Sequence, residues 1–266
     1  KAFSERKKEN MKLSDDKVEL ARRHNKVVYK DGDRTVKVFV PTKPDIDVFR
    51  EALNLARIST AGLNTPKVLE VSQVMDGSWA LSMVYHPGTT LHEMMVEAKG
   101  TPKFDELLQL FVDLQIKVQK TPAPAALTAQ GDKLVRMIAR VKDLDPSVRY
   151  DLQMKADRMK RGFAICHGDL NPTNVVIGEG EPFICDWTHV TVGLPEADAA
   201  MTYMLLKLEF PEAADKYLDL YSVTADVPKQ KIMYWLPVVA AAELSRGRKG
   251  NEEFLKSWID AASDYE

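Results

Sequence analysis

The chain has 266 residues, of which 45% are hydrophobic, and this is enough apolar material to bury one large core or two ordinary ones. The 37 Lys and Arg residues nearly balance the 39 Asp and Glu residues, so there is no basic surplus of the kind that binds nucleic-acid phosphates. The longest uncharged apolar stretch, residues 232–242, contains Pro237 and is shorter than the roughly 20 residues that span a bilayer. These features exclude a mainly disordered chain and argue against nucleic-acid and membrane partners.

The cysteine content and the first residues predict a cytoplasmic location. Cys166 and Cys185 each lie in an apolar run, which is typical of buried thiols in a reducing compartment. Residues 1–26 are charged and net basic, with no apolar run that would mark a targeting signal. No obligatory protein partner is visible in the sequence.

From Val27 onward the residue pattern predicts a small lobe rich in antiparallel strands. The turn signals Asp31-Gly32 and Asp76-Gly77 each separate two β-rich runs, which favours two hairpins. A helical stretch that opens at Pro44 lies between them. In chain order, the expected strands and helix cover residues 27–30, 34–40, 44–60, 68–74 and 79–85.

After Pro87-Gly88 the apolar spacing becomes that of helices, as in residues 104–118. One β-rich island, residues 163–185, interrupts the helical pattern, which resumes at Pro195 and continues to the end. We therefore expect an α+β protein with a smaller sheet lobe and a larger, mainly helical lobe. The expected segments are a charged N-terminal stretch, the sheet lobe and the helical lobe, at residues 1–26, 27–86 and 87–266.

The island carries the clearest chemical signal in the chain. It reads Ile165-Cys-His167-Gly-Asp169-Leu-Asn-Pro-Thr-Asn174, and Asp186-Trp187 follow on the next apolar run. Taken singly, these residues are ordinary turn formers and caps. Together, an Asp, an Asn five residues later and a second Asp form an arrangement that phosphoryl-transfer sites use to hold Mg²⁺ and a substrate hydroxyl.

With this motif the sequence resembles the aminoglycoside phosphotransferase and choline kinase family, whose members are small-molecule kinases with a protein-kinase-like two-lobe fold. The resemblance covers most of the chain from about Val27. It implies that Asp169 is the base for the acceptor hydroxyl, that His167 braces the loop, and that Asn174 and Asp186 hold Mg²⁺. It also implies ATP or GTP as co-substrate and a nucleotide-binding role for the sheet lobe. In this reading Asp198, in the segment after Gly193, is structural.

The sheet lobe offers an independent check on this interpretation. A kinase needs a strand lysine at the nucleotide phosphates and a helix carboxylate that orients it. Lys37 is the one charged residue inside the run Val36–Val40, and Glu51 shares a helix face with Val48 and Leu55. The alternative is an exposed Lys37 and a Glu51 that pairs with a nearby arginine.

The segment before Pro87-Gly88 resembles the family's adenine-binding hinge. Val84 and His86 are the candidates for backbone contacts with the base, and Met83 for the back of the pocket; a plain strand end is the alternative. In contrast, residues 21–26 contain no glycine where a phosphate-covering loop would have one. A solvated charged turn is the favoured reading there, although Asn25 or Lys26 offers a side chain to phosphate.

Other functions fit the sequence less well. Zinc binding by Cys166, His167, Cys185 and His189 is disfavoured, because adjacent residues in a strand point to opposite faces and no knuckle spacing occurs. A protein kinase is disfavoured because too few residues follow Asp186 for an activation segment. The glycine-free turn leaves one alternative, a nucleotide-binding module without catalytic activity.

The acceptor also stays open. Residues 192–266 hold 13 acidic and 8 basic residues, a mild excess that suits a cationic aminoglycoside but also ordinary solvated helices. The sequence therefore predicts a phosphotransferase that acts on a hydroxyl of an aminoglycoside-, choline- or sugar-like small molecule.

Overall fold

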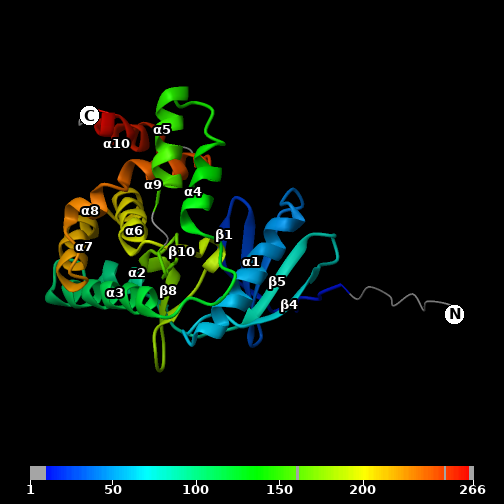
Figure 1. Ribbon diagram of the computed structural model, residues 1–266. Helices are drawn as coiled ribbons and strands as arrows, with labels where there is room; N and C mark the ends of the chain where they lie inside the picture. Colours follow the sequence, from blue (N-terminus) through cyan, green and yellow to red (C-terminus); the bar gives the residue numbers. More distant parts are fainter. Residues whose placement is uncertain (1–9, 160–161, 249, 264–266) are drawn as a thin grey trace. The chain divides into compact units, whose positions relative to one another are not determined.

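The computed structural model describes residues 10–159, 162–248 and 250–263 (Figure 1). Two compact units account for the chain. The first comprises the residues up to Gly88 together with Gly178–Thr188, and the second comprises Thr89–Ile177 and the residues from His189 onward. The first unit is thus built from two separate pieces of sequence.

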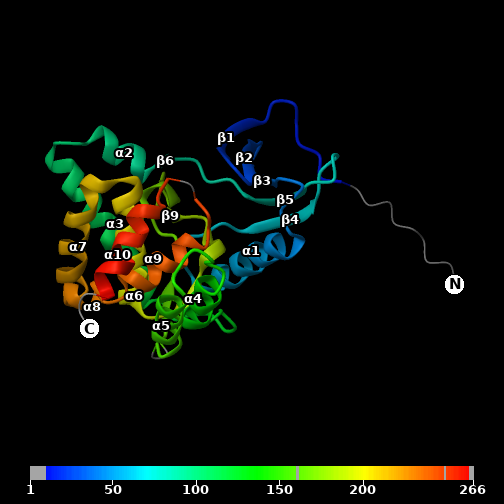
Figure 2. The same cartoon turned by 90° about the horizontal axis from the view of Figure 1, so that it is seen from above.

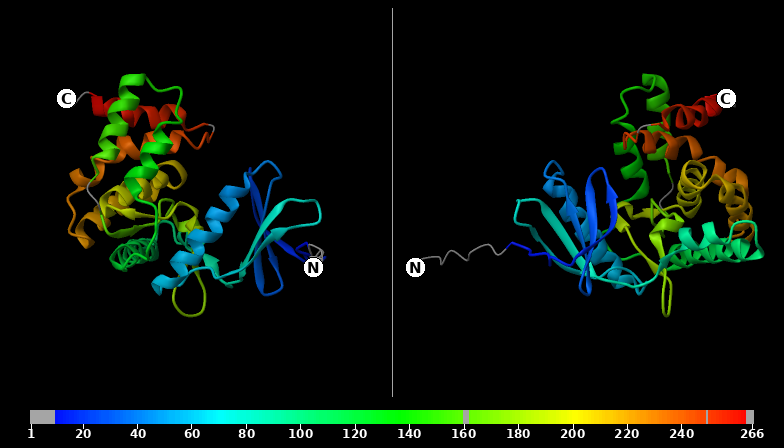
Figure 3. Two further views of the ribbon diagram at one scale, coloured as in Figure 1. Left: turned by 45° about the vertical axis from the view of Figure 1, so that its right-hand side comes forward. Right: turned by 180° about the vertical axis from the view of Figure 1, so that it is seen from behind.

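A five-stranded antiparallel sheet forms most of the first unit, with the strand order β1-β2-β3-β5-β4. Helix α1 (Asp45–Ile58) packs against β4 and β5 (Figures 1 and 3). The strands are β1 (Val18–Arg23), β2 (Lys26–Asp31), β3 (Arg34–Phe39), β4 (Val68–Gln73) and β5 (Trp79–Val84).

The apolar spacing of α1 explains how the helix seats on the sheet. Val48, Leu55 and Ile58 are fully buried along one side, whereas Phe49 and Leu53 on the next side are about half exposed. The expected helix therefore forms with the first of its two apolar faces inward.

Strand β1 was not predicted, because it lies inside the stretch that the sequence analysis read as a charged segment. Five of its six residues are exposed, and three of them are Glu19, Arg22 and Arg23. An edge strand that is exposed on both faces shows no alternation of apolar and polar residues, so pattern analysis has nothing to detect. Its pairing with β2, from Val18 to Arg23, is what defines it as a strand.

The segment Gly178–Thr188 joins the first unit through hydrogen bonds with Asn64. Ile184 N donates to Asn64 O at 3.0 Å, and Asn64 Nδ2 donates to Glu181 O at 2.8 Å. The segment contains the short strand β9 (Phe183–Ile184) and leads into the turn η3 (Trp187–His189). Buried Trp187 donates through Nε1 to Ile184 O at 2.8 Å, which closes this turn.

The second unit is mainly helical, with α9 at its centre. Every residue of α9 from Leu236 to Glu243 is buried, and the helix packs against α4, α6 and α10 (Figure 2). In chain order the helices are α2 (Leu91–Glu97), α3 (Pro102–Lys120), α4 (Gln130–Ile138), α5 (Pro146–Asp157), α6 (Pro195–Glu209), α7 (Pro211–Thr224), α8 (Lys229–Met233), α9 (Leu236–Leu244) and α10 (Glu252–Ser263).

Two short strand pairs frame the loop that carries the motif. Strand β7 (Ala164–Cys166) pairs with β10 (Thr191–Gly193), and β8 (Val175–Ile177) pairs with β6 (Thr89–Thr90). The predicted island is therefore correct in position, while β10 and β6 were missed because three and two residues are too few to show a period. Among the described residues, no helix is long and apolar enough to cross a bilayer.

Candidate active site

A lysine and a glutamate meet in the interior of the first unit. Lys37 lies on β3 between Val28 of β2 and Leu81 of β5, and Glu51 lies on the buried side of α1. Lys37 Nζ is 2.6 Å from Glu51 Oε1, and both side chains are less than one tenth exposed. Because the pair is buried, each charge depends on the other for its stabilisation.

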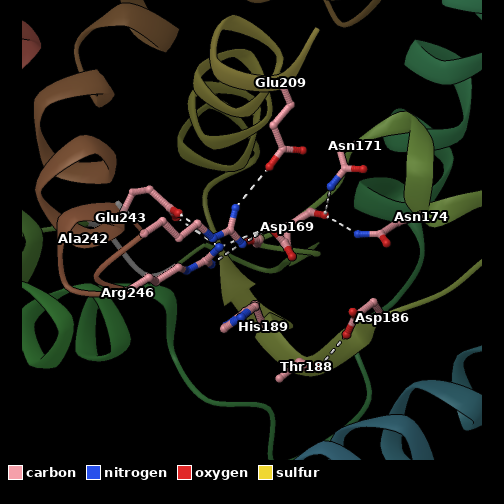
Figure 4. A network of polar contacts seen from close by, with 12 residues as sticks. Asp169, Asn171, Asn174, Asp186, Thr188, His189, Glu209, Ala242, Glu243 and Arg246 are labelled. Carbon is pink, nitrogen blue, oxygen red and sulfur yellow. Dashed lines mark hydrogen bonds and ion pairs between the residues drawn. The ribbon is translucent and has the colours of Figure 1, made fainter. Parts of the chain in front are cut away.

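The carboxylate of Asp186 lies at the same place in this unit and receives two ammonium groups. Lys37 Nζ is 3.4 Å from Oδ1 and Lys26 Nζ is 3.0 Å from Oδ2. Thr188 Oγ1 donates to Oδ1 at 2.7 Å, as Figure 4 shows. Asp186 has a φ of +58°, an uncommon conformation for a residue other than glycine and a frequent mark of functional positions.

The electrostatics of this cluster keep Asp186 and Lys37 charged. Burial alone would raise the pKa of Asp186, but Lys37 and Lys26 outweigh it and hold that pKa well below its ordinary value. Burial likewise opposes the charge on Lys37, but the carboxylates of Asp186 and Glu51 raise its pKa above the ordinary value. Burial, reinforced by Asp186, raises the pKa of the neighbouring Cys185 thiol to about 11.

Lys26 is a member of this cluster, although the sequence named it only as an alternative contact to phosphate. It follows the two-residue turn His24-Asn25 at the start of β2, and its side chain is 13% exposed. The favoured expectation of a solvated charged turn is therefore wrong for Lys26. The signal that favours Lys26 is the absence of glycine from this turn. Without a close backbone approach, a side chain must supply the positive charge that a phosphate needs.

The predicted hinge residues lie at the end of β5. Met83 is buried, and Val84 N donates to Lys67 O at 3.0 Å. This bond commits the N–H of Val84 to the protein, so only its carbonyl qualifies for the base contact that was predicted. The ring of His86 stacks on Phe183 at 3.9 Å, and burial together with Lys67 lowers its pKa.

In the second unit, a compact loop after β7 carries the predicted base and the predicted metal-binding amide. The backbone carbonyl of Asp169 accepts from Asn174 Nδ2 at 2.8 Å and from Asn171 Nδ2 at 3.3 Å (Figure 4). Asn171 Oδ1 caps the turn η2 (Pro172–Asn174) by accepting from Thr173 N. His167, which begins the loop, is fully buried.

Gly168 explains why this loop needs a glycine. Its φ is +75°, and a Cβ at this position would lie 2.6 Å from the carbonyl oxygen of His189. Its N–H donates to Asp198 Oδ1 at 2.9 Å. Asp198, buried on α6, therefore anchors the loop from behind, as expected for a structural role.

An arginine that the sequence analysis missed contacts the carboxylate of Asp169. Arg246, just after α9, reaches Asp169 Oδ1 with Nη1 and the Gly168 carbonyl with Nη2, both at 3.1 Å (Figure 4). Nη1 is also 3.0 Å from Glu243 Oε2, and Glu243 is 1% exposed. Burial raises the pKa of Glu243 despite Arg246 and Arg248 beside it. No motif marks Arg246, because it lies 77 positions after Asp169 in sequence.

The zinc interpretation finds no support in the part of the chain that the structure describes. No group of three or more His, Cys, Asp or Glu side chains there is placed to hold a metal ion. Neither Cys166 nor Cys185 forms a disulfide in the part of the chain that the structure describes.

Comparison with solved structures identifies the fold. An aminoglycoside phosphotransferase APH(4)-Ia mutant, in a ternary complex with ADP and hygromycin B, matches with a TM-score of 0.68 and 12% identity, over 93% of this chain and 92% of that one. The GDP complex of aminoglycoside 2'-phosphotransferase-IIIa matches with a TM-score of 0.58 and 16% identity, over 92% of each chain. An aminoglycoside-3'-phosphotransferase of type VIII matches with a TM-score of 0.60 and 18% identity, over 85% of this chain and 93% of that one.

These likenesses confirm the predicted protein-kinase-like two-lobe fold. The fold and the motif together define a phosphotransferase with an alcohol group as acceptor. The model of the phosphotransferase enzyme family matches residues 21–229, and the chain belongs to this family, as the sequence resemblance predicted. A search of the curated proteins found no match.

Proposed function

We propose that the protein transfers the γ-phosphoryl group of ATP or GTP to a hydroxyl group of a small molecule. The observation that carries this proposal is the Lys37–Glu51–Asp186 cluster, in which a buried lysine holds one carboxylate for orientation and reaches a second one. A structural ion pair needs only one partner of each sign. The second carboxylate, kept ionised by Lys37 and Lys26, suits a place where a metal ion and phosphate groups bind.

In the first unit the proposed roles concern the nucleotide. Lys37 binds the α- and β-phosphates and Glu51 orients it. The carbonyl of Val84 and the backbone of His86 contact the base, and Met83 lines the back of the base pocket. The solved relatives with ADP or GDP bound support a nucleotide co-substrate of this kind.

In the second unit the proposed roles concern the acceptor. Asp169 orients the hydroxyl group and accepts its proton as the O–P bond forms. His167 braces the loop from the interior. The bonds that Asn171 and Asn174 donate to the Asp169 carbonyl fix the loop backbone, and Arg246 fixes one oxygen of the carboxylate.

As the family resemblance implies, Asp186 of the first unit and Asn174 of the second would hold Mg²⁺, and the chemistry of each side chain by itself suits this ion. Magnesium takes carboxylate and amide oxygens, and the depressed pKa of Asp186 keeps its carboxylate ionised. The bond from Asn174 Nδ2 to the Asp169 carbonyl fixes the plane of the Asn174 amide and the direction of its oxygen. When bound, the ion neutralises charge on the nucleotide phosphates.

For the acceptor we propose an alcohol of the aminoglycoside, amino-alcohol or sugar type. Solved relatives bind hygromycin B or kanamycin, which supports a polyhydroxylated acceptor. Around Asp169 the guanidinium groups of Arg246 and Arg248 stand against the carboxylates of Glu243 and Glu209. Because positive and negative groups alternate there, neutral sugars belong in the test panel beside cationic compounds.

The test is Asp169→Asn in a coupled assay of phosphate transfer to an acceptor panel, with Asp151→Asn on α5 as the control for an exposed carboxylate. We expect the Asp169 variant to keep its affinity for Mg-nucleotide within a few-fold and to lose about 10²- to 10⁴-fold in kcat, the usual effect of removing a general base. Transfer at the wild-type rate would refute the role of Asp169. Nucleotide binding by the wild type with no transfer to any acceptor would favour the catalytically silent module.

A further inference from the structure

The lysine that begins β2 contacts a carboxylate far away in sequence. Lys26 Nζ is 3.0 Å from Asp186 Oδ2, across 160 positions of the chain and within the same compact unit. The side chain is only 13% exposed, so the ammonium group is largely withdrawn from water. Withdrawing an ammonium group from water costs free energy that a surface ion pair does not repay, so this placement requires a reason.

The turn before Lys26 cannot do what a glycine-rich turn does. Residues 21–26 contain no glycine, and Arg23 pairs with Lys26 across a two-residue turn made of His24 and Asn25. The carbonyl of Asn25 accepts from Val40 N at 3.1 Å, which fixes the turn to the sheet. A phosphate near this hairpin therefore cannot rely on the close backbone approach that glycine permits.

Of the two basic residues on β1, Arg23 is exposed and Arg22 is paired elsewhere. Arg22 forms an exposed ion pair with Glu19, at 2.5 Å. Lys26 is thus the cation that the hairpin brings to the Asp186 cluster. Among the described residues, Asp186 is the one ion-pair partner that the structure gives to Lys26.

The two lysines at Asp186 are held differently. Lys37 has Glu51 at 2.6 Å and Asp186 at 3.4 Å, so its shorter bond is to the glutamate, which keeps it in place. For Lys26 the described part of the chain shows no second carboxylate beside Asp186. Its long, flexible side chain can therefore exchange Asp186 for another anion by a small rotation.

We propose that Lys26 is a second phosphate-binding lysine, which takes the place of the glycine-rich turn by giving its ammonium group to the terminal phosphates of the nucleotide. The inference rests on the proposed nucleotide-dependent function. In the absence of nucleotide, Asp186 holds the ammonium group. When a nucleoside triphosphate binds, Lys26 donates to its phosphate oxygens instead.

The experiment compares the wild type with Lys26→Met, Lys26→Arg and the control Lys43→Met by isothermal titration. Lys43 lies in the same unit and pairs with Asp47, so the control also removes one ammonium group from an ion pair. The ligands are adenosine, ADP and ATP, with guanosine, GDP and GTP in parallel. Each titration is done with Mg²⁺ and again with EDTA. If Lys26→Met weakens nucleotide binding only by disturbing a metal ion at Asp186, the loss of affinity disappears when EDTA removes the metal.

We expect Lys26→Met to weaken triphosphate binding about 10- to 100-fold, the value of one hydrogen bond to a charged group, and to leave nucleoside binding unchanged. The loss should be smaller for the diphosphate and should persist with EDTA. Lys26→Arg should recover part of the affinity, and Lys43→Met should bind as the wild type does.

Two results would overturn the proposal for Lys26 while leaving the proposed function intact. One is an unchanged triphosphate affinity in Lys26→Met, and the other is a loss that is equal for nucleoside and triphosphate or that vanishes with EDTA. If the wild type binds none of the nucleotides under either condition, the proposed function fails, and the role of Lys26 fails with it.

Discussion

Asp198 is the residue whose replacement tests the architecture of the second unit most directly. Its side chain is 1% exposed and accepts three bonds: Gly168 N at 2.9 Å, Gln119 Nε2 at 3.1 Å and Gln115 Nε2 at 3.3 Å. The amide oxygens of the two glutamines accept from tyrosine hydroxyl groups, at 2.6 Å from Tyr217 and 2.7 Å from Tyr221. Both glutamines are therefore fixed with their NH₂ groups toward Asp198.

An Asp198→Asn change keeps the size of the side chain and makes this network impossible to satisfy. One end of the new amide carries its own NH₂ group, which must face either the glutamine donors or the N–H of Gly168. A buried donor that loses its partner costs about 1–3 kcal/mol, and the remaining bonds lose their charge assistance. We therefore expect the free energy of unfolding to fall by about 2–4 kcal/mol.

Urea unfolding measures this loss, and Asp215→Asn is the matched control. Asp215 pairs with Lys207 on the surface with its side chain 74% exposed, so its replacement should cost under about 0.5 kcal/mol. Amide hydrogen exchange supplies a local readout, because the Gly168 N–H should lose protection in the Asp198 variant alone. An unfolding free energy within about 0.5 kcal/mol of the wild type would refute the reasoning.

Two further predictions concern a glycine and a thiol. Gly168→Ala should lower stability by about 2–4 kcal/mol, because it adds a contact with a carbonyl oxygen to the strain of a positive φ. Gly100→Ala carries the same strain of a positive φ, but its new Cβ meets no atom within 4 Å. Thermal unfolding of the two variants therefore isolates the cost of the contact with the carbonyl oxygen. Equal losses of stability in the two variants would contradict this contribution. Because burial raises the pKa of Cys185 to about 11, alkylation of Cys185 at pH 8 should be about 100-fold slower than that of a free thiol and should accelerate up to about pH 11. Peptide mass spectrometry measures this rate, and a midpoint near 8.5 would exclude the shift.

The parts of the site that sequence reasoning found are those that follow local rules. Lys37 is a single charge within an apolar strand and Glu51 is a single charge on the buried side of a helix, so each is visible from its own neighbours. The spacing of Asp169 and Asn174 is also local, since both belong to one short loop. The α+β class and most elements followed from the same local patterns.

The parts that it missed depend on contacts between distant residues. Arg246 lies beside Asp169 because α9 ends there, and nothing near Arg246 in sequence distinguishes it from Arg248. Lys26 was only an alternative phosphate contact in a turn expected to be solvated, because its partner Asp186 lies 160 positions away. Strand β1 escaped for a related reason, since its exposed residues carry no pattern and only the pairing with β2 defines it.

The division of the first unit into two pieces of sequence has a consequence for biosynthesis. A ribosome completes β1 to β5 and α1 by Val84, but it must synthesise about a hundred more residues before Gly178–Thr188 can join them. Until then Lys26 lacks its ion-pair partner Asp186, and Lys37 pairs with Glu51 alone. The first unit therefore cannot be completed until residues 89–177, which belong to the second unit, have been synthesised. An isolated fragment that ends at Gly88 would carry two inward ammonium groups against one carboxylate, and it should need the peptide 178–188 to become compact.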